Sequence, residues 1–397
     1  MPCGPNGTDS LLEALRIEPR HPDALAVTRL TLTRFRGYEL ARLEPDRRPV
    51  ALIGPNGAGK TNLLEAVSFL APGRGLRGAR LAEVERIGSP PGSGWAVAAV
   101  VETPAGPVEI GTGREAGIHE TDRRVVRIDG HPAKGQTVLA EHVALVWLTP
   151  QMDRLFLEGS SGRRRFLDRL VFGFDPAHAG RLSRYEHAMR ERARLLRDGR
   201  SDDGWLSSLE DQMATTGMAV AAARLDVAQR LRAACARAVG PFPGAELAVE
   251  GTVEEWLGNG PALAAEDALR DQLRASRRHD SEAGGAAVGP HKSDLAVRHQ
   301  DKGMPAGLCS TGEQKALLIA IVLANARLLA AERGAAPLLL LDEVAAHLDE
   351  ERRRALFGEL LALGAQAWLT GTDAAVFAPL GEDARRFRVE DARVAPG

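Results

Sequence analysis

The chain has 397 residues, enough for one large domain or two of ordinary size. Its 44% hydrophobic and 26% charged residues are typical of a folded protein and exclude a wholly disordered chain. The net charge of −2 gives no overall attraction to DNA or to anionic membranes, so a nucleic-acid contact would have to be a local patch.

The sequence shows no sign of export or of membrane insertion. It does not open with a basic segment followed by an apolar core, and the apolar run at 316–324 is too short to cross a bilayer. The three cysteines, Cys3, Cys235 and Cys309, form no CxxC pair and no metal-ligand spacing. We therefore expect a cytoplasmic protein without a membrane partner.

The N-terminal third is predicted to contain mainly strands. Residues 1–25 are rich in proline, glycine and charge and are interpreted as an N-terminal extension. Alternating apolar residues from Ala26 predict a strand. The apolar segment 50–53 predicts a second strand, which runs through a glycine-rich turn into a helix that begins near Lys60. Short β segments between 94 and 129, separated by turn residues, predict an antiparallel meander.

The rest of the chain is predicted to contain a helical segment followed by a segment that mixes strands and helices. Residues 161–279 are rich in arginine and alanine and are predicted to be mainly helical, without a fixed-period repeat. Strand signals return at 286–299, and a long apolar helix follows Ser310. The leucine run before Asp342 predicts a buried parallel strand, and a helix is expected after Asp349.

A complete phosphate-binding loop, G-x-x-x-x-G-K-T, lies between the second strand and its helix. Glycines allow backbone N–H groups to surround phosphate oxygens, and the helix N-terminus adds partial positive charge. Lys60 is expected to reach the β- and γ-phosphates of ATP, and the Thr61 hydroxyl to bind Mg²⁺. The expected ATP-binding residues are Gly54, Pro55, Asn56, Gly57, Ala58, Gly59, Lys60, Thr61 and Asn62.

Two acids, Asp342 and Glu343, end the leucine-rich strand. Carboxylates at the C-terminal end of a parallel strand lie where α/β sheets bind their ligands. We expect Asp342 to hold Mg²⁺ and Glu343 to polarise the attacking water as a general base. Taken alone, the pair leaves a helix N-cap with charged neighbours open as the less favoured alternative, and the phosphate loop further favours catalysis.

The segment Ser310, Gly312 and Glu313 opens the long apolar helix. Ser310 and Gly312 at a helix start can form an N-cap and a second anion site, and by itself the segment favours a simple cap. The order of phosphate loop, Ser310 segment, Asp342-Glu343 strand and Asp349 resembles an ABC-type ATPase head. The resemblance implies that ATP is sandwiched in a homodimer, with Ser310, Gly312 and Glu313 acting on the partner's ATP.

The same resemblance implies roles for two further residues. Asp349 would lie in the loop that faces the partner subunit, and Gln151 would contact Mg²⁺ and the γ-phosphate. The histidine usual after the next strand is replaced by the sequence LTGTD at 369–373. This departure is compatible with slow hydrolysis, that is, with a weak Mg²⁺-dependent ATPase.

Three more segments resemble the RecF family of SMC-like ATPases: FRGY at 35–38, SSGRRRFLD at 160–168 and GPHKSDL at 289–295. The resemblance implies an ATP-dependent clamp on duplex DNA and at gap junctions, with RecO and RecR proteins as partners. It also implies assistance in loading a recombinase at single-strand gaps. The expected fold is α/β, an ABC/SMC-like P-loop ATPase head with a mixed sheet (26–150 and 286–397) plus a mainly helical second lobe (151–285).

Arginines are concentrated in the predicted helical lobe. Between Arg163 and Arg200 there are eleven arginines and five acidic residues. A solvated helical face and a DNA-phosphate surface remain open as alternatives, and Arg163, Arg164 and Arg165 are the candidate DNA contacts. His291 is interpreted as a structural hinge residue rather than a catalytic one.

Two other functions remain as alternatives. The first is an ATPase subunit of a transporter, although the insertion between Gln151 and Ser310 is long for that class. The second is an ATPase switch that does not bind DNA. An SMC chromosome-organising protein would need long heptad arms, which the sequence lacks, and no separate carboxylate cluster suggests a nuclease.

Overall fold

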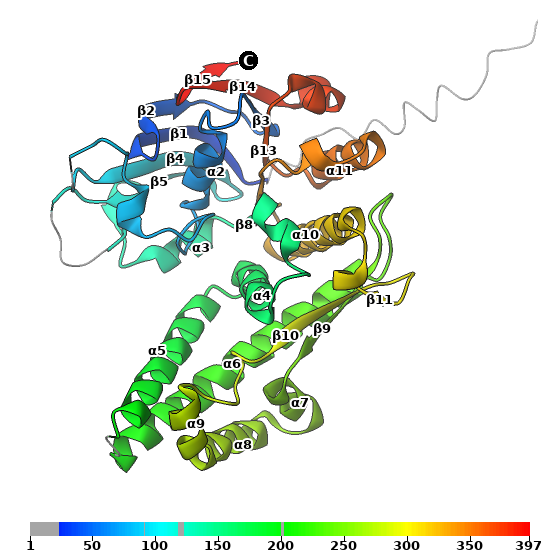
Figure 1. Ribbon diagram of the computed structural model, residues 1–397. Coiled ribbons are helices and arrows are strands. Elements are labelled where there is room, and N and C mark those ends of the chain that lie inside the picture. The colour runs from blue at the N-terminus through cyan, green and yellow to red at the C-terminus, as the bar shows by residue number, and fades with distance from the viewer. Residues whose placement is uncertain (1–23, 91, 118–122, 200–201) are drawn as a thin grey trace, which may run out of the picture.

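The computed structural model describes residues 24–90, 92–117, 123–199 and 202–397 (Figure 1). Almost all of the expected N-terminal extension, 1–25, lies outside the described residues. The α/β class and the mixed sheet expected from the sequence are confirmed. Strand-rich layers and a mainly helical part are separate in the ribbon, with the helical part below in this view.

One six-stranded sheet is antiparallel and has the order β2-β1-β4-β5-β6-β7. Its strands are β1 (Ala26–Phe35), β2 (Tyr38–Leu43), β4 (Trp95–Thr103), β5 (Gly106–Arg114), β6 (Val125–Ile128) and β7 (His131–Pro132). The meander predicted between 94 and 129 is confirmed, because β4, β5 and β6 pair antiparallel in succession.

The second six-stranded sheet carries the chemistry and has the order β15-β14-β3-β13-β12-β8. Five strands are parallel and β15 is an antiparallel edge. The strands are β3 (Val50–Ile53), β8 (Leu145–Leu148), β12 (Leu338–Leu341), β13 (Ala367–Gly371), β14 (Arg385–Glu390) and β15 (Arg393–Pro396). The parallel arrangement brings the C-terminal ends of β3, β12, β13 and β8 to one edge.

Alternation along β12 explains its leucine run. Leu338 and Leu340 pack on one side with α2 (Lys60–Ser68), in the core shared with the antiparallel sheet. Leu339 and Leu341 pack on the other side with α10 (Thr311–Arg333). Because successive strand residues point to opposite faces, a strand covered on both faces must be apolar throughout.

The apolar run at 316–324, expected to be too short to cross a bilayer, lies within helix α10, which is long and apolar enough to do so by length and composition. Most of it is buried among the sheet, α6 (Asp203–Cys235) and α11 (Glu350–Leu363). The burial inside the protein accounts for its apolar side chains. Short helices complete this part of the chain: η1 (Leu81–Val84), η2 (Gln136–Val138), α3 (Leu139–His142), η3 (Pro150–Arg154), η4 (Ala306–Leu308), η5 (Ala345–His347) and η6 (Ala374–Asp383).

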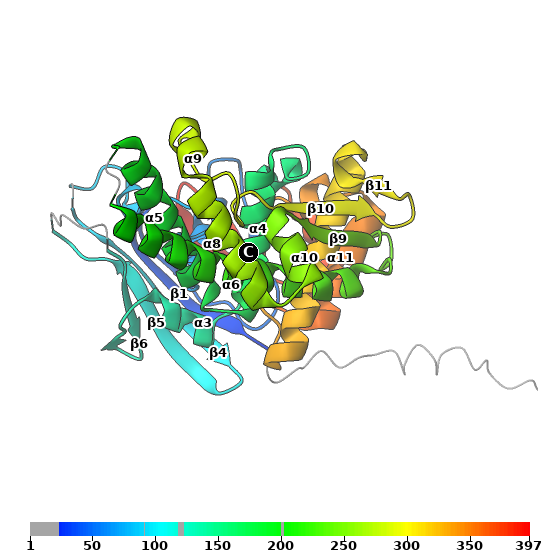
Figure 2. The same cartoon turned by 90° about the horizontal axis from the view of Figure 1, so that it is seen from below.

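The second lobe is mainly helical but contains a small sheet (Figure 2). Its other helices are α4 (Ser160–Phe174), α5 (His178–Arg197), α7 (Thr252–Asn259), α8 (Ala262–Ala275) and α9 (Arg277–Ala283). The sheet has the order β11-β10-β9, from β9 (Ala245–Glu250), β10 (Asp294–His299) and β11 (Met304–Pro305). Strand β10 follows residue 285 and pairs with β9, so the sheet crosses the boundary placed there from the sequence.

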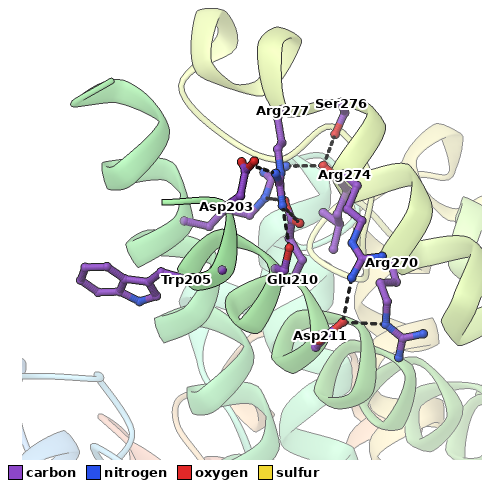
Figure 3. A network of polar contacts seen from close by, with 12 residues as sticks. Asp203, Trp205, Glu210, Asp211, Arg270, Arg274, Ser276 and Arg277 are labelled. Carbon is purple, nitrogen blue, oxygen red and sulfur yellow. Dashed lines mark hydrogen bonds and ion pairs between the residues drawn. The ribbon is translucent and has the colours of Figure 1, made fainter. Parts of the chain in front are cut away.

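Buried charges join the helices of this lobe. Arg192 of α5 is 1% exposed and contacts Glu210 of α6 at 2.9 Å and Asp280 of α9 at 2.8 Å. Arg277 also contacts Glu210 through two guanidinium nitrogens, as Figure 3 shows beside the more exposed Asp211–Arg270 pair. Each buried charge therefore has an opposite charge, which burial requires.

A second buried cluster joins α4 to α5 and α6. Arg224 donates two hydrogen bonds of 2.8 Å to the carboxylate of Asp168, and His178 Nε2 lies 2.9 Å from the same carboxylate. Burial alone would raise the pKa of Asp168, but the hydrogen bonds from His178 and Arg224 hold it below its usual value. The stability from this ionised carboxylate is complete above the unfolded pKa of about 4 and is lost as pH falls through the lower folded pKa.

Replacing Arg224 by methionine is expected to lower the free energy of unfolding by about 3–5 kcal/mol at pH 7, because the Asp168 charge would be left buried without Arg224. Urea unfolding measures the change. The exposed Arg237 serves as the matched control, and Arg237→Met should cost little. The double variant Arg224→Met/Asp168→Asn should recover part of the loss. A loss below about 1 kcal/mol for Arg224→Met would place this pair among weak surface pairs and contradict the expectation.

Candidate nucleotide-binding site

The phosphate loop runs from the end of β3 at Ile53 to the start of α2 at Lys60. Glycine is required at two positions by close contacts. A Cβ on Gly54 would lie 2.0 Å from the carbonyl oxygen of Val389. Gly59 has φ 109°, and a Cβ there would lie 2.6 Å from the Tyr38 hydroxyl, which donates to the Gly59 carbonyl at 3.2 Å. Neighbouring elements therefore fix the loop from both ends.

Lys60 closes the loop on itself. Its Nζ donates to the carbonyl oxygens of Gly54 at 2.7 Å and Pro55 at 2.8 Å, and the residue is buried. Burial lowers the pKa of Lys60, while the carboxylates of Glu343 and Asp342 act in the opposite direction. An ammonium group held by neutral carbonyl oxygens can exchange them for phosphate oxygens, which are stronger acceptors.

Thr61 and Asp342 meet at the edge of the parallel sheet. Thr61 Oγ1 lies 3.0 and 3.1 Å from the two carboxylate oxygens of Asp342. Burial raises the pKa of Asp342, hydrogen bonds from Thr370 and Thr61 lower it, and the charge of Glu343 raises it further. A hydroxyl and a carboxylate are hard oxygen donors, and a nearby cation would offset the buried charge. The residues present therefore fit Mg²⁺.

Thr370, at the end of β13, joins the two acidic residues. Its Oγ1 lies 2.8 Å from Asp342 Oδ1 and accepts a 2.8 Å hydrogen bond from the backbone N–H of Glu343. Glu343 has φ 54°, a conformation that costs free energy for a residue with a side chain. Thr370 was not predicted from the sequence, and its only signal is its place at the end of the strand beside β12.

Replacing Thr370 by valine is expected to lower kcat for ATP hydrolysis about tenfold or more, since both acidic residues lose a hydrogen bond. ATP affinity should change much less, because Thr370 forms no hydrogen bond with the phosphate loop among the described residues. A coupled ATPase assay and nucleotide titration separate the two effects. Thr370→Ser should restore kcat, and Thr33→Val in β1 is the matched control. An unchanged kcat in Thr370→Val would refute this role.

Ser310 caps α10 at some distance along the chain from this cluster. The backbone N–H of Glu313 donates to Ser310 Oγ at 3.4 Å, and Glu313 accepts from the Ser310 N–H at 2.9 Å. Hydrogen bonds from Lys302 and Ser310 lower the pKa of Glu313 to about 2. Within the part of the chain that the structure describes, no hydrogen bond or ion pair joins this cap to the phosphate loop.

The N-termini of α10 and α11 lie close together. A Cβ on Gly312 would lie 3.7 Å from Arg352 Nη1, and the same nitrogen lies 3.6 Å from Asp349 Oδ2. Asp349 is exposed and caps α11 by accepting from the Arg352 N–H. The expected signature and dimer-facing residues therefore share one exposed surface.

Gln151 lies in η3, directly after β8. Leu148 at the end of β8 pairs with Leu341, and its carbonyl accepts from the Asp342 N–H at 2.9 Å. Gln151 is thus held at the same edge of the sheet as Asp342. Its side chain is exposed and forms no hydrogen bond with the residues that the structure describes.

The three candidate DNA-contact arginines differ in environment. Arg163 donates two 2.7 Å hydrogen bonds to Asp294, and Arg164 donates to the carbonyl of Ser293 at 2.6 Å. Both therefore hold α4 to the start of β10. Arg165 is exposed, and its side chain forms no hydrogen bond or ion pair with a described residue. Of the three, Arg165 alone has a side chain without a hydrogen-bond or ion-pair partner among the described residues.

Comparison with known proteins identifies the family. Residues 26–378 match the family described as RecF/RecN/SMC N terminal domain. The DNA replication and repair protein RecF of Allorhizobium ampelinum is 51% identical over 93% of this chain and 98% of its own length. RecF of Mesorhizobium japonicum is 50% identical over 94% of this chain and 99% of its own.

Solved structures agree on the fold. A structure of "the recombination mediator protein RecF-ATPrS in RecFOR pathway" aligns with a TM-score of 0.81 at 22% identity, covering 94% of this chain and 98% of that one. An Smc head domain from Pyrococcus furiosus aligns with a TM-score of 0.50 at 15% identity, covering 93% of this chain and 95% of the other. These likenesses concern the fold, whereas the relatives at about half identity cover nearly the whole chain. The chain therefore belongs to the RecF family of DNA replication and repair ATPases.

Proposed function

We propose that this chain is an ATP-dependent DNA clamp of recombinational repair, in which two subunits close around two Mg²⁺-ATP molecules. The observation that carries the proposal is the separation of two half-sites. Lys60, Thr61, Asp342 and Glu343 converge at one edge of the sheet, whereas the capped Ser310 segment is exposed and forms no hydrogen bond or ion pair with the phosphate loop among the described residues. We infer that a second subunit brings its Ser310 segment onto the nucleotide.

The residues of the first half-site have distinct tasks. Lys60 exchanges its carbonyl partners for β- and γ-phosphate oxygens, and backbone N–H groups of the phosphate loop surround the phosphates. Thr61, Asp342 and Gln151 would hold Mg²⁺, which when bound neutralises phosphate charge. Glu343 accepts a proton from the attacking water, with its backbone held by Thr370.

The second half-site comes from the partner. Ser310, Gly312 and the α10 N-terminus present a hydroxyl, backbone N–H groups and partial positive charge to the γ-phosphate. Asp349 lies beside them on the same surface. Hydrolysis removes the γ-phosphate that joins the subunits, so the dimer opens. The sequence LTGTD at 369–373 has no histidine at the place where one is usual, and this is compatible with the slow hydrolysis that suits a switch.

The DNA role and the partners rest on the relatives. The chain is about half identical to proteins named for DNA replication and repair, and its fold matches a recombination mediator of the RecFOR pathway. We infer duplex DNA and gap junctions as ligands, RecO and RecR proteins as partners, assistance in recombinase loading at single-strand gaps, and a cytoplasmic location. Family membership argues against the transporter subunit considered from the sequence. An ATPase switch that ignores DNA remains the competing function.

Sedimentation velocity with and without ATP and Mg²⁺, each with and without duplex DNA, tests the proposal. A dimer that needs both ATP and Mg²⁺, and that sediments with DNA less as salt rises, is expected. A dimer that forms with ATP but ignores DNA would support the DNA-independent switch. A protein that stays monomeric with ATP, Mg²⁺ and DNA would contradict the two-subunit site.

A further inference from the structure

Two adjoining hollows lie on the second lobe, between α5 and the segment that leads from α9 to β10. Their volumes are about 440 and 350 Å³, and Met189, Arg190 and His291 line both. Helices α5 and α9 pack against each other, as Figure 1 shows at the lower end of the lobe. Because the two hollows share these three lining residues, we treat them together and call them the α5 channel.

The α5 channel is strongly basic. Seven basic and two acidic side chains line it. The acidic Asp168 is buried and neutralised by Arg224, and Glu186 lies 3.6 Å from Arg190. The basic lining residues are Arg164, Arg165, Arg190, Arg194, Arg197, Arg224 and Lys292. A concave surface lined by one sign of charge concentrates the field and attracts ions of the opposite sign.

Three of these side chains lack a partner. Arg165, Arg197 and Lys292 are exposed and form no side-chain hydrogen bond or ion pair with any residue that the structure describes. By contrast Arg192, on the opposite face of α5, is buried and bound to Glu210 and Asp280. The arginines of this helix are therefore divided between a buried structural network and an open basic face.

The spacing along α5 suits a polyanion. Arg190, Arg194 and Arg197 stand at i, i+4 and i+7, so they share one face of the helix. At about 1.5 Å per residue, Arg190 and Arg197 are separated by about 10 Å along the axis. One DNA strand places a phosphate about every 3.4 Å along its axis, so this stripe spans about three phosphates.

Among the described residues that line the α5 channel, none offers an exposed aromatic ring for base stacking. The aromatic lining residue Tyr185 is buried, and its hydroxyl lies 2.7 Å from His291 Nδ1, while His291 Nε2 lies 2.9 Å from the Ala286 carbonyl. Burial lowers the pKa of His291, so it adds little charge. Small residues, Gly284, Gly285 and Ala286, are among the other residues that line the α5 channel. Small residues and unpaired cations suit a sugar-phosphate backbone, without sequence reading.

We propose that the α5 channel binds the phosphate backbone of DNA through Arg165, Arg197 and Lys292, with Arg190 and Arg194 in support. The inference rests on the proposed DNA function and identifies the α5 channel as the surface that would bind the DNA. It replaces the contact set expected from the sequence, because Arg163 and Arg164 are bound within the chain. An acidic protein partner is the competing occupant of such a surface.

The test is duplex binding by the full-length protein with ATP and Mg²⁺, measured by fluorescence anisotropy over a range of salt concentrations. The variant Arg165→Ala/Arg197→Ala/Lys292→Ala removes the three unpaired cations. Its matched control, Arg127→Ala/Lys134→Ala/Arg237→Ala, also removes two arginines and one lysine that are exposed, but away from the channel. ATPase activity and thermal unfolding of both variants check that the fold is kept.

Each phosphate contact contributes about 0.9 to the slope of log K against log salt for B-DNA. The channel variant should therefore have a slope shallower by about 2–3, with weaker binding to every duplex sequence, and the control should match wild type. The charge-preserving variant Arg165→Lys/Arg197→Lys/Lys292→Arg should keep the wild-type slope. Equal slopes for the channel variant, the control and wild type would overturn the channel while leaving DNA binding intact, and would favour the protein partner. A wild-type protein that fails to bind DNA would overturn the proposed function and the channel with it.

Discussion

Replacing Lys60 by methionine is expected to abolish ATP binding at concentrations that saturate the wild-type protein. Lys60 Nζ is held by the carbonyl oxygens of Gly54 and Pro55, so its ammonium already points across the phosphate loop. Two charge-assisted hydrogen bonds to phosphate contribute about 3–6 kcal/mol, which corresponds to more than a hundred-fold in Kd. Methionine fills nearly the same length but has no donor and no charge.

Equilibrium titration with a fluorescent ATP analogue measures this effect. The control is Lys134→Met, which makes the same substitution at an exposed position after β7. The control should bind ATP like wild type and unfold at the same temperature. Near-normal affinity in Lys60→Met would mean that the phosphates are bound elsewhere and would contradict the site. Loss of the ATP-dependent dimer should accompany the loss of binding, because the proposed partner contact is made to the γ-phosphate.

Local patterns were enough to predict the strand–loop–helix around Lys60 and the apolar strand before Asp342. Both depend on interactions close in sequence, such as glycine turns, helix N-termini and alternation of side chains across a sheet. The confirmed fold class follows from these patterns, together with the long apolar helix after Ser310. The helix expected to begin near Lys60 is confirmed, since α2 begins at that residue.

Contacts between distant segments could not be predicted in the same way. Thr370 reaches Asp342 and Glu343 only because β13 lies beside β12. The β9–β10 pairing joins residues on either side of the expected boundary at 285, and alternation alone does not identify a strand's partner. Arg163 resembled a solvent-facing or DNA-facing arginine, but an acidic residue far along the chain, Asp294, binds it. Counting charges along the sequence cannot distinguish an exposed arginine from one that is bound within the protein, because the count does not say which acidic residue lies beside it in the fold.

Replacing Glu343 by glutamine is expected to slow hydrolysis by about 10²–10⁴-fold, the range typical of a lost general base. ATP binding should remain, because glutamine has the same shape and the backbone N–H can still donate to Thr370. Removing the charge of Glu343 also removes one of the effects that raise the pKa of Asp342, which favours the ionised form of the carboxylate proposed to hold magnesium. Since opening requires loss of the γ-phosphate, the dimer formed with ATP should persist.

Sedimentation of Glu343→Gln with ATP and Mg²⁺, followed over hours, distinguishes a trapped dimer from a transient one. The matched control is Glu351→Gln on α11, an exposed glutamate eight residues along, which should hydrolyse ATP and return to the monomer like wild type. A further variant, Glu343→Gln/Ser310→Arg, should bind ATP yet remain monomeric, because the bulky side chain at the N-cap of α10 would hold the partner's phosphate away from the helix N-terminus. A monomeric Glu343→Gln protein that still binds ATP would separate nucleotide binding from dimerisation and refute the shared site. A wild-type rate of ATP hydrolysis in Glu343→Gln would mean that another group is the general base. The proposed catalytic role of Glu343 would then be wrong.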